Sequence, residues 1–198
     1  DPPRGTVRAT HSERLKLYKK LADSGRLKPV SKDTFHAGFT SGLFAVVKDQ
    51  NRDRMILDAR PANMLSKGQQ KWSQTMASGM TLAHFHLQPD EVLVASGEDL
   101  KDYFYQFLVG EERCSKNALA VPVQQSEARE IFGPNFQWSE DPVWLGLETL
   151  AMGDTLAVEF AQASHIGLCL RYRVAHPDEM LTLQGSIPRG LLQVGVIV

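Results

Sequence analysis

Cysteine is scarce in this chain of 198 residues, and its scarcity excludes several classes of protein. Cys114 and Cys169 are too few and too scattered for a disulfide framework or a four-cysteine zinc site. No apolar run approaches the roughly 18 residues needed to cross a bilayer, and residues 1–14 lack the apolar stretch of a secretion signal. We therefore expect a soluble, intracellular protein without a membrane partner, whose two thiols are buried or idle.

The signatures of common enzyme classes are also missing. There is no glycine-rich phosphate loop, no serine in a nucleophile elbow and no cysteine in a catalytic setting. His84 and His86 are two residues apart, which on a strand would turn both imidazoles to one side. No third ligand, HExxH pattern or cysteine pair accompanies them, so we interpret them as packing or surface residues and keep zinc binding as the minor alternative.

What the chain does contain is an ordinary globular composition with an uneven charge distribution. It is 42% hydrophobic and 23% charged, so disorder is not expected. Residues 1–60 hold 13 Lys and Arg against 7 Asp and Glu, and residues 61–198 hold 9 against 16. A basic region attracts polyanions and an acidic region can gather divalent cations, although many soluble domains are lopsided by chance.

The hydrophobic pattern predicts a mixture of helices and strands. A capped amphipathic helix is expected from Ser12 to Ala22, ended by Gly25, and a second helix from Thr155 to Leu170. Residues 124–142 are polar and contain Gly133-Pro134, so they are interpreted as a surface insertion. Strands are expected at residues 26–30, 42–48, 54–58, 92–100 and 118–123.

The two ends of the chain look cut rather than natural. The sequence opens with Asp1 instead of Met and closes on the apolar run 191–198, which has strand character and no turn after it. We interpret the chain as a fragment that stops inside a strand.

Residues 42–63 resemble the fingers hairpin of reverse transcriptases of the retroelement type. The shared pattern is a strand ending in Lys48, a polar turn, and then Arg54, Arg60 and Asn63 at set spacings. The resemblance implies that Lys48 and Arg54 contact the triphosphate of the incoming nucleotide, while Arg60 and Asn63 shape the fingers. A planar guanidinium can bind phosphate oxygens in a fork, and Lys adds a point charge. Taken singly, each basic residue is better explained as solvated surface.

Residues 98–106 resemble the first catalytic motif of the same family, in which an aspartate is followed five residues later by an aromatic side chain. The resemblance implies that Asp99 binds both catalytic metals and that Phe104 packs under the incoming sugar. Tyr103 departs from the pattern, since the family usually has a small residue there. Without the resemblance, Asp99 would be interpreted as an aspartate that caps the end of a strand.

Residues 150–162 resemble the second palm motif, a strand-to-helix turn with a glycine and, nine residues later, a glutamine. By resemblance, Gly153 lets the backbone approach nucleotide and template closely, and Gln162 belongs to the nucleotide site. A glycine at an ordinary loop-helix junction is the alternative. Asp154 and Glu159 are unusual choices within this motif. The third palm motif is an apolar strand that delivers two adjacent aspartates, and the sequence ends where that pair is expected.

The sequence therefore predicts an α+β fold of two layers, with reverse-transcriptase-like fingers and an antiparallel palm sheet backed by helices, truncated before the Asp-Asp hairpin. Residues 1–90 would form a fingers-like lobe with a basic hairpin at 42–58, and residues 91–198 a partial palm. The expected activity is RNA-directed DNA synthesis with two Mg²⁺ ions, an RNA or DNA primer-template and deoxynucleoside triphosphates. The alternative is a catalytically dead remnant that at most binds nucleic acid.

Overall fold

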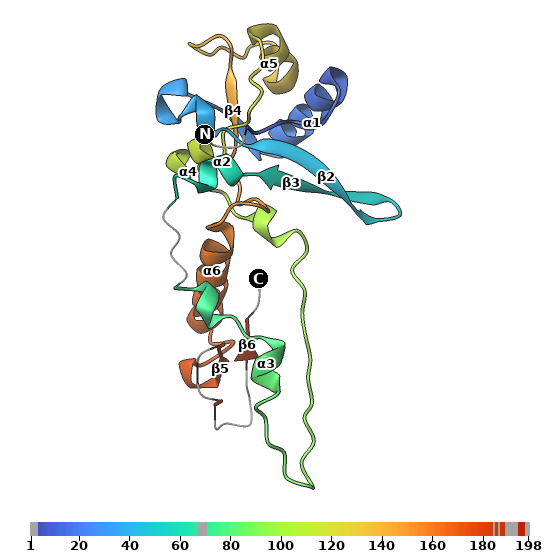
Figure 1. The fold of residues 1–198 in the computed structure, drawn as a ribbon, viewed down its shortest axis with the longest axis vertical. Helices are drawn as coiled ribbons and strands as arrows, with labels where there is room; N and C mark the ends of the chain where they lie inside the picture. The colour runs from blue at the N-terminus through green and yellow to red at the C-terminus, as the bar shows by residue number, and fades with distance from the viewer. Residues whose placement is uncertain (1–3, 67–70, 184, 186, 189–193, 197–198) are drawn as a thin grey trace. The chain divides into compact units, whose positions relative to one another are not determined.

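The computed structural model describes the chain except for residues 1–3, 67–70, 184, 186, 189–193 and 197–198. Helices and small, mainly antiparallel sheets are mixed along the chain, so the predicted α+β class is confirmed (Figure 1). Each sheet among the described residues has two strands, and one continuous palm sheet stays a prediction. None of the helices that the structure describes is long and apolar enough to cross a membrane.

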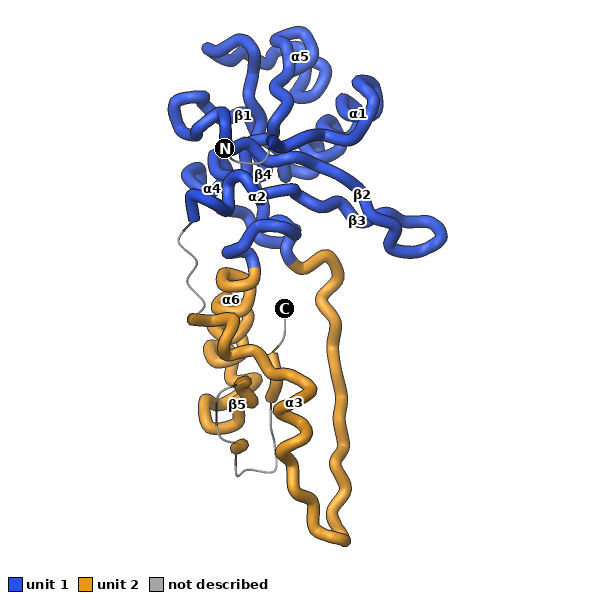
Figure 2. Tube along the Cα trace, in the orientation of Figure 1, with its two compact units in different colours: residues 1–67, 104–157 blue, residues 68–103, 158–198 orange. Residues whose placement is uncertain are grey.

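Contacts divide the chain into two compact units that interleave in sequence (Figure 2). Unit 1 comprises residues 1–67 and 104–157, and unit 2 comprises residues 68–103 and 158–198. The division into a fingers-like lobe and a partial palm at residue 90 stays a prediction.

The elements of unit 1 are mostly short. In chain order they are α1 (His11–Asp23), β1 (Leu27–Val30), the 3-10 helices η1 (Lys32–Thr34) and η2 (Ala37–Phe39), β2 (Gly42–Asp49), β3 (Arg52–Asp58), α2 (Arg60–Asn63), α4 (Glu111–Lys116), α5 (Gln125–Phe132) and β4 (Trp144–Leu147). A further 3-10 helix, η4 (Tyr103–Gln106), begins at the last residue of the first segment of unit 2.

The first helix starts earlier than predicted. Thr10, not Ser12, is the N-cap of α1, because the Thr10 hydroxyl accepts from the backbone N–H of Glu13 while the Glu13 carboxylate accepts from the Thr10 N–H at 2.9 Å. This reciprocal capping box satisfies two of the N–H groups that a helix leaves unpaired at its start. The predicted end at Gly25 is confirmed, and this residue has a φ of 67°.

The core of unit 1 lies between two small sheets and two helices. β2 pairs antiparallel with β3, with Leu43 opposite Leu57, and β1 pairs antiparallel with β4, with Leu27 opposite Leu147. These four leucines are at most 3% exposed and belong to one hydrophobic cluster with residues of α1 and α5. The strand predicted at 118–123 appears as isolated bridges rather than as a regular strand, and two of its residues, Leu119 and Val123, belong to this cluster.

The predicted surface insertion at residues 124–142 is wrong in one respect. Its first half forms α5, and Ala128 and Ile131 are no more than 1% exposed within the core cluster. A capping box between Gln124 and Glu127 begins this helix. The polar composition hid the buried face because two apolar side chains three residues apart suffice to dock a helix of eight residues.

The strand predicted at residues 92–100 is not formed. This segment has no regular structure, and Val92 and Val94 are 82% and 86% exposed. A strand needs a neighbour that satisfies its N–H and C=O groups, and no described residue pairs with this segment. The apolar composition predicted a buried strand, but composition alone cannot supply the partner.

Unit 2 is built around α6, which begins with the last residue of unit 1. Its elements are η3 (Ser73–Thr75), α3 (Gly79–Leu82), α6 (Ala157–Arg171), η5 (Pro177–Glu179), β5 (Met180–Leu181) and β6 (Val194–Gly195). The helix predicted at 155–170 is thus confirmed. Of the predicted terminal strand, only residues 194–196 are described, and β6 pairs in parallel with β5.

Candidate functional site

The β2–β3 hairpin presents basic side chains on its exposed end. Arg54 lies opposite Val46, and both residues are exposed, whereas the base of the hairpin turns Leu43 and Leu57 into the core. Lys48 is also exposed, and the register shifts between Val47 and Asp49, so a bulge redirects the chain at Lys48. The hairpin predicted from the sequence is therefore confirmed, with both predicted phosphate-binding residues on its outer half.

Two of the three acidic residues of the hairpin, Asp49 and Asp58, are paired with arginines. The backbone N–H of Asn51 and the guanidinium of Arg52 together lower the pKa of Asp49, which lies 2.7 Å from Arg52. Arg60 binds Asp58 with two hydrogen bonds of 2.7 Å each, and this fork lowers the pKa of Asp58. Both carboxylates thus stay ionised at neutral pH and neutralise arginines other than Arg54.

The turn that carries Gly153 lies against the free edge of β3. The backbone N–H of Leu57 donates to the carbonyl of Met152 at 2.9 Å. Gly153 has a φ of 108°, and a Cβ atom there would overlap the carbonyl oxygen of Leu57. A backbone does approach Gly153 closely, as predicted, but the approaching backbone is that of β3 in the same chain. Its approach to a nucleotide stays a prediction.

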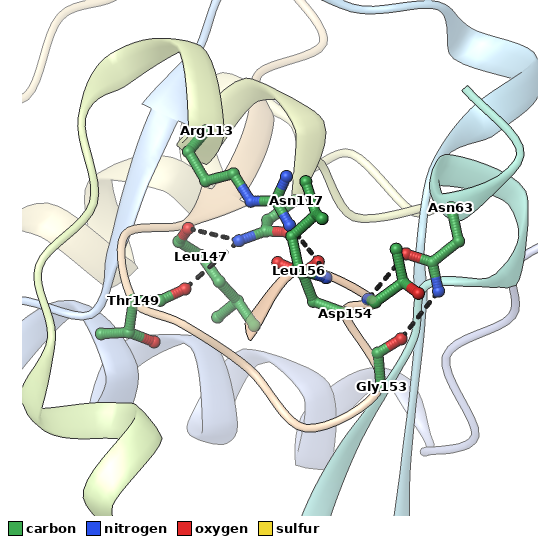
Figure 3. A network of polar contacts seen from close by, with 9 residues as sticks. Asn63, Arg113, Asn117, Leu147, Thr149, Gly153, Asp154 and Leu156 are labelled. Carbon is green, nitrogen blue, oxygen red and sulfur yellow. Dashed lines mark hydrogen bonds and ion pairs between the residues drawn. The ribbon is translucent and has the colours of Figure 1, made fainter. Parts of the chain in front are cut away.

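Asn63, the last residue of α2, holds the same turn from the other side. Its Nδ2 donates to the carbonyl of Gly153 at 2.8 Å, and its Oδ1 accepts from the backbone N–H of Thr155 at 3.0 Å. One side-chain amide therefore satisfies a carbonyl and an N–H of the turn at once (Figure 3).

Helix α4 supports the turn through two side chains four residues apart. Nδ2 of Asn117, which directly follows the helix, contacts the carbonyls of Leu147 and Thr149 at 3.4 and 3.2 Å. Arg113 forms an ion pair with Asp154 (Figure 3). Residues i and i+4 share one face of a helix, so a single face of α4 contacts the chain both before and after Gly153.

The remaining predicted site residues lie in different surroundings. Phe104 is half-buried and belongs to unit 1, together with Lys48, Arg54 and Gly153. Asp99 belongs to unit 2, where it is exposed in the segment without regular structure. Four of the five predicted nucleotide-binding residues therefore belong to unit 1, and the fifth, Gln162, belongs to unit 2.

Gln162 is fully buried in unit 2. Its Nε2 donates to the carbonyl of Val196 at 3.0 Å and contacts the hydroxyl of Thr75 at 3.4 Å. The residue thus links α6 to the terminal apolar run at Val196. Its predicted place in the nucleotide site stays a prediction.

Two residues that departed from the family pattern have structural partners in unit 2. The Tyr103 hydroxyl donates to the carbonyl of Ala161 at 3.2 Å, so the large side chain lies against α6. The Glu159 carboxylate accepts from the backbone N–H groups of Trp72 and Ser73 and from the Ser73 hydroxyl at 2.6 to 3.1 Å. Burial opposes ionisation of Glu159 most strongly, but these hydrogen bonds outweigh it and lower its pKa.

Metal ligands are incomplete in the part of the chain that the structure describes. No group of three or more His, Cys, Asp or Glu side chains there could hold an ion, and this includes the surroundings of Asp99 and of the His84–His86 pair. The aspartates that would complete the predicted Mg²⁺ site are expected after Val198, which lies outside the described residues. Both cysteines are free, and burial raises the pKa of the Cys114 thiol to about 12, so this thiol is inert as predicted.

Sequence reasoning missed the polar network that holds the turn. Asn63 was expected to shape the fingers, but its contact with Gly153 was not foreseen, and neither Arg113 nor Asn117 was singled out. The available signal was Asp154, an acidic residue directly after a glycine and before an apolar helix, because such a residue needs a donor when it is buried. No protein-family model matches the chain, and no curated protein matches its sequence.

Proposed function

We propose that this chain forms the fingers and the front part of the palm of a reverse-transcriptase-like polymerase, which extends a primer by two-metal nucleotidyl transfer. The supporting observation is the contact between Asn63 and the Gly153 turn. Asn63 ends the fingers pattern, and Gly153 is the glycine of the second palm motif, 90 residues further along the chain. Neither pattern by itself requires this contact, so their meeting in the fold supports both.

Unit 1 exposes basic side chains that could bind the phosphates of a nucleoside triphosphate. Lys48 and Arg54 are exposed on the hairpin and would bind phosphate oxygens, Arg54 through its planar fork. Phe104 would pack against the sugar. The nearby acids Asp49 and Asp58 are paired with other arginines, so they compete less for Arg54.

Asp99 is the carboxylate that this chain would contribute to the metal site. It is exposed and therefore accessible to a hydrated cation. Two Mg²⁺ ions, when bound, supply Lewis-acid stabilisation of the charge that develops on the phosphates. The two aspartates expected after Val198 would provide the remaining carboxylates.

Primer extension by a protein that contains this chain together with the two aspartates proposed to follow Val198 tests this proposal. With Mg²⁺ and deoxynucleotides, Asp99→Asn is expected to lower kcat by about 10³-fold or more, because it removes a ligand shared by both metals. Glu98→Gln, the adjacent exposed acid, serves as the matched control and should keep near-full activity. Unchanged extension by the Asp99 variant would contradict the proposal, as would codons other than two aspartates directly after Val198.

A nucleic-acid-binding remnant is the second candidate, and the exposed basic end of the hairpin favours it. That surface forms independently of any metal ligand, so it could bind phosphates without catalysis. A wild-type protein that binds primer-template with a steep salt dependence, loses affinity in Lys48→Ala/Arg54→Ala and never extends a primer would establish this alternative.

A further inference from the structure

The ion pair between Arg113 and Asp154 is the most deeply buried one that the structure describes. The two side chains are 13% and 3% exposed. Oδ1 of Asp154 accepts both from Arg113 and from the backbone N–H of Leu156, the latter at 2.9 Å. Oδ2 of Asp154 is buried and accepts no hydrogen bond from any described residue.

Stability gives such a pair little advantage over apolar side chains. Removing two charges from water costs free energy that their attraction often only balances, and apolar replacements of similar size are frequently as stable. Because the buried Oδ2 of Asp154 accepts no hydrogen bond from a described residue, it makes the free energy of burying the pair less favourable. Buried ionic contacts are best accounted for where they select one conformation over others.

The conformation selected here is that of the Gly153 turn. Asp154 bonds the N–H two residues ahead, and its backbone carbonyl accepts from the N–H of Ala157 at 3.1 Å, so it shapes the entry into α6. Arg113 then fastens this residue to α4 (Figure 3). Leu57 and Asn63 hold the turn at Met152, Gly153 and Thr155, whereas the hydrogen bonds described for the Asp154 side chain come from Arg113 and Leu156.

We propose that Arg113 and Asp154 are positioning residues that hold the Gly153 turn in one conformation and thereby set the affinity of the polymerase for the incoming deoxynucleotide. This inference rests on the proposed function, since it takes the turn to be part of the nucleotide site. Neither residue touches the nucleotide. The pair acts through the backbone of residues 153–156, whose geometry decides how closely a nucleotide can approach.

A double variant that leaves the net charge unchanged removes the ion pair between Arg113 and Asp154 without leaving either charge buried and unpaired. We call it the tether variant. Arg113→Met/Asp154→Asn keeps an oxygen acceptor for the Leu156 N–H but removes the ion pair. The matched control is Lys28→Met/Glu148→Gln, which removes an ion pair of 2.6 Å in the same unit that joins β1 to the residue after β4 and does not contact the turn. Both variants are made in the protein used to test the proposed function and are compared with its wild type in two assays, steady-state primer extension and amide hydrogen exchange.

The tether variant is expected to raise the KM for deoxynucleotide by about tenfold while kcat changes less than about threefold, the signature of weakened binding rather than lost chemistry. Amides 154–157 should exchange at least about tenfold faster, because the turn opens more often. The control variant should match the wild type in both assays. If the tether variant fails to fold, Arg113→Lys, which keeps the charge but not the fork, replaces it and should show the same changes to a smaller degree.

The two assays separate the inference from the proposed function. Unchanged exchange at residues 154–157 overturns the inference even if the protein is an active polymerase. Faster exchange with an unchanged KM also overturns it. If the wild type never extends a primer, the proposed function fails, and the deoxynucleotide part of the inference fails with it, while the exchange result still decides whether the pair holds the turn.

Discussion

Unit 1 and unit 2 both bury apolar and polar side chains, but they differ in how the apolar ones are clustered. Both hydrophobic clusters that the structure describes consist of residues of unit 1, where fourteen buried residues form the larger cluster. In unit 2, two polar residues of α6, Glu159 and Gln162, are buried and bind the backbone of segments far away in sequence. Clustered apolar area is therefore the larger contribution in unit 1, and in unit 2 directional contacts such as these carry more of the stability.

Apolar packing and single polar contacts differ in how well they tolerate substitutions. Apolar packing tolerates changes of sequence at many positions, while a backbone held by one carboxylate or one amide depends on that residue alone. The Gly153 turn combines packing with directional contacts. It lies against Leu57 of β3, and it is also held by the amide of Asn63 and by the ion pair of Arg113 with Asp154. Substitutions of glycine and of a buried carboxylate can therefore test how each unit is held.

The largest expected effect is that of Gly153→Ala in unit 1. The methyl group would overlap the carbonyl of Leu57, and a φ of 108° is unfavourable for alanine. We expect a loss of about 2–6 kcal/mol in the free energy of unfolding, from about 1–3 for backbone strain and about 1–3 for overpacking. Urea denaturation measures this loss. Gly38→Ala is the control, since a Cβ there meets no atom within 4 Å, and it should change stability little.

Glu159→Gln should have a smaller effect, confined to unit 2. It replaces a charged acceptor of three hydrogen bonds, so we expect a loss of about 1–3 kcal/mol, seen as faster amide exchange at residues 72–75. Because folding lowers the pKa of Glu159, its stabilisation is present above the unfolded pKa near 4.5 and is lost as the pH falls through the folded value. The variant should lack this acid-dependent loss.

The exposed Glu130→Gln in α5 serves as the control for that experiment. It should leave exchange at residues 72–75 unchanged at every pH. Equal acid sensitivity in wild type and Glu159→Gln would show that another group is responsible for the ordering of η3.

The smallest expected effect has the opposite sign. Gly167 lies inside α6 and is exposed, and a Cβ added there would meet no atom within 4 Å, so Gly167→Ala should stabilise this helix of unit 2 by about 0.5–1 kcal/mol. Slower amide exchange within residues 163–171 would demonstrate it. Destabilisation would mean that the exposed face of α6 is packed against a partner, and the contrast between the two units would then need revision.

Local patterns predicted the elements whose signals lie within the element itself. The β2–β3 hairpin was predictable because two apolar runs flank a polar turn, and α6 because its spacing is helical with few breakers. The special role of Gly153 was also foreseen, but not its neighbour, because the pattern identifies a position that needs glycine without saying which atom approaches it.

The sequence by itself thus determined the mixed α and β character, the basic hairpin and the helix that follows the glycine turn, since each depends on residues close together in the chain. Tertiary structure alone decided that residues 92–100 stay unpaired, that α5 enters the core, and that Asn63 and Arg113 hold the Gly153 turn. The contacts of Asn63 and Arg113 with this turn join residues 90 and 41 positions apart. A pattern of spacing cannot name such partners, because hydrogen bonds and burial are properties of the folded chain.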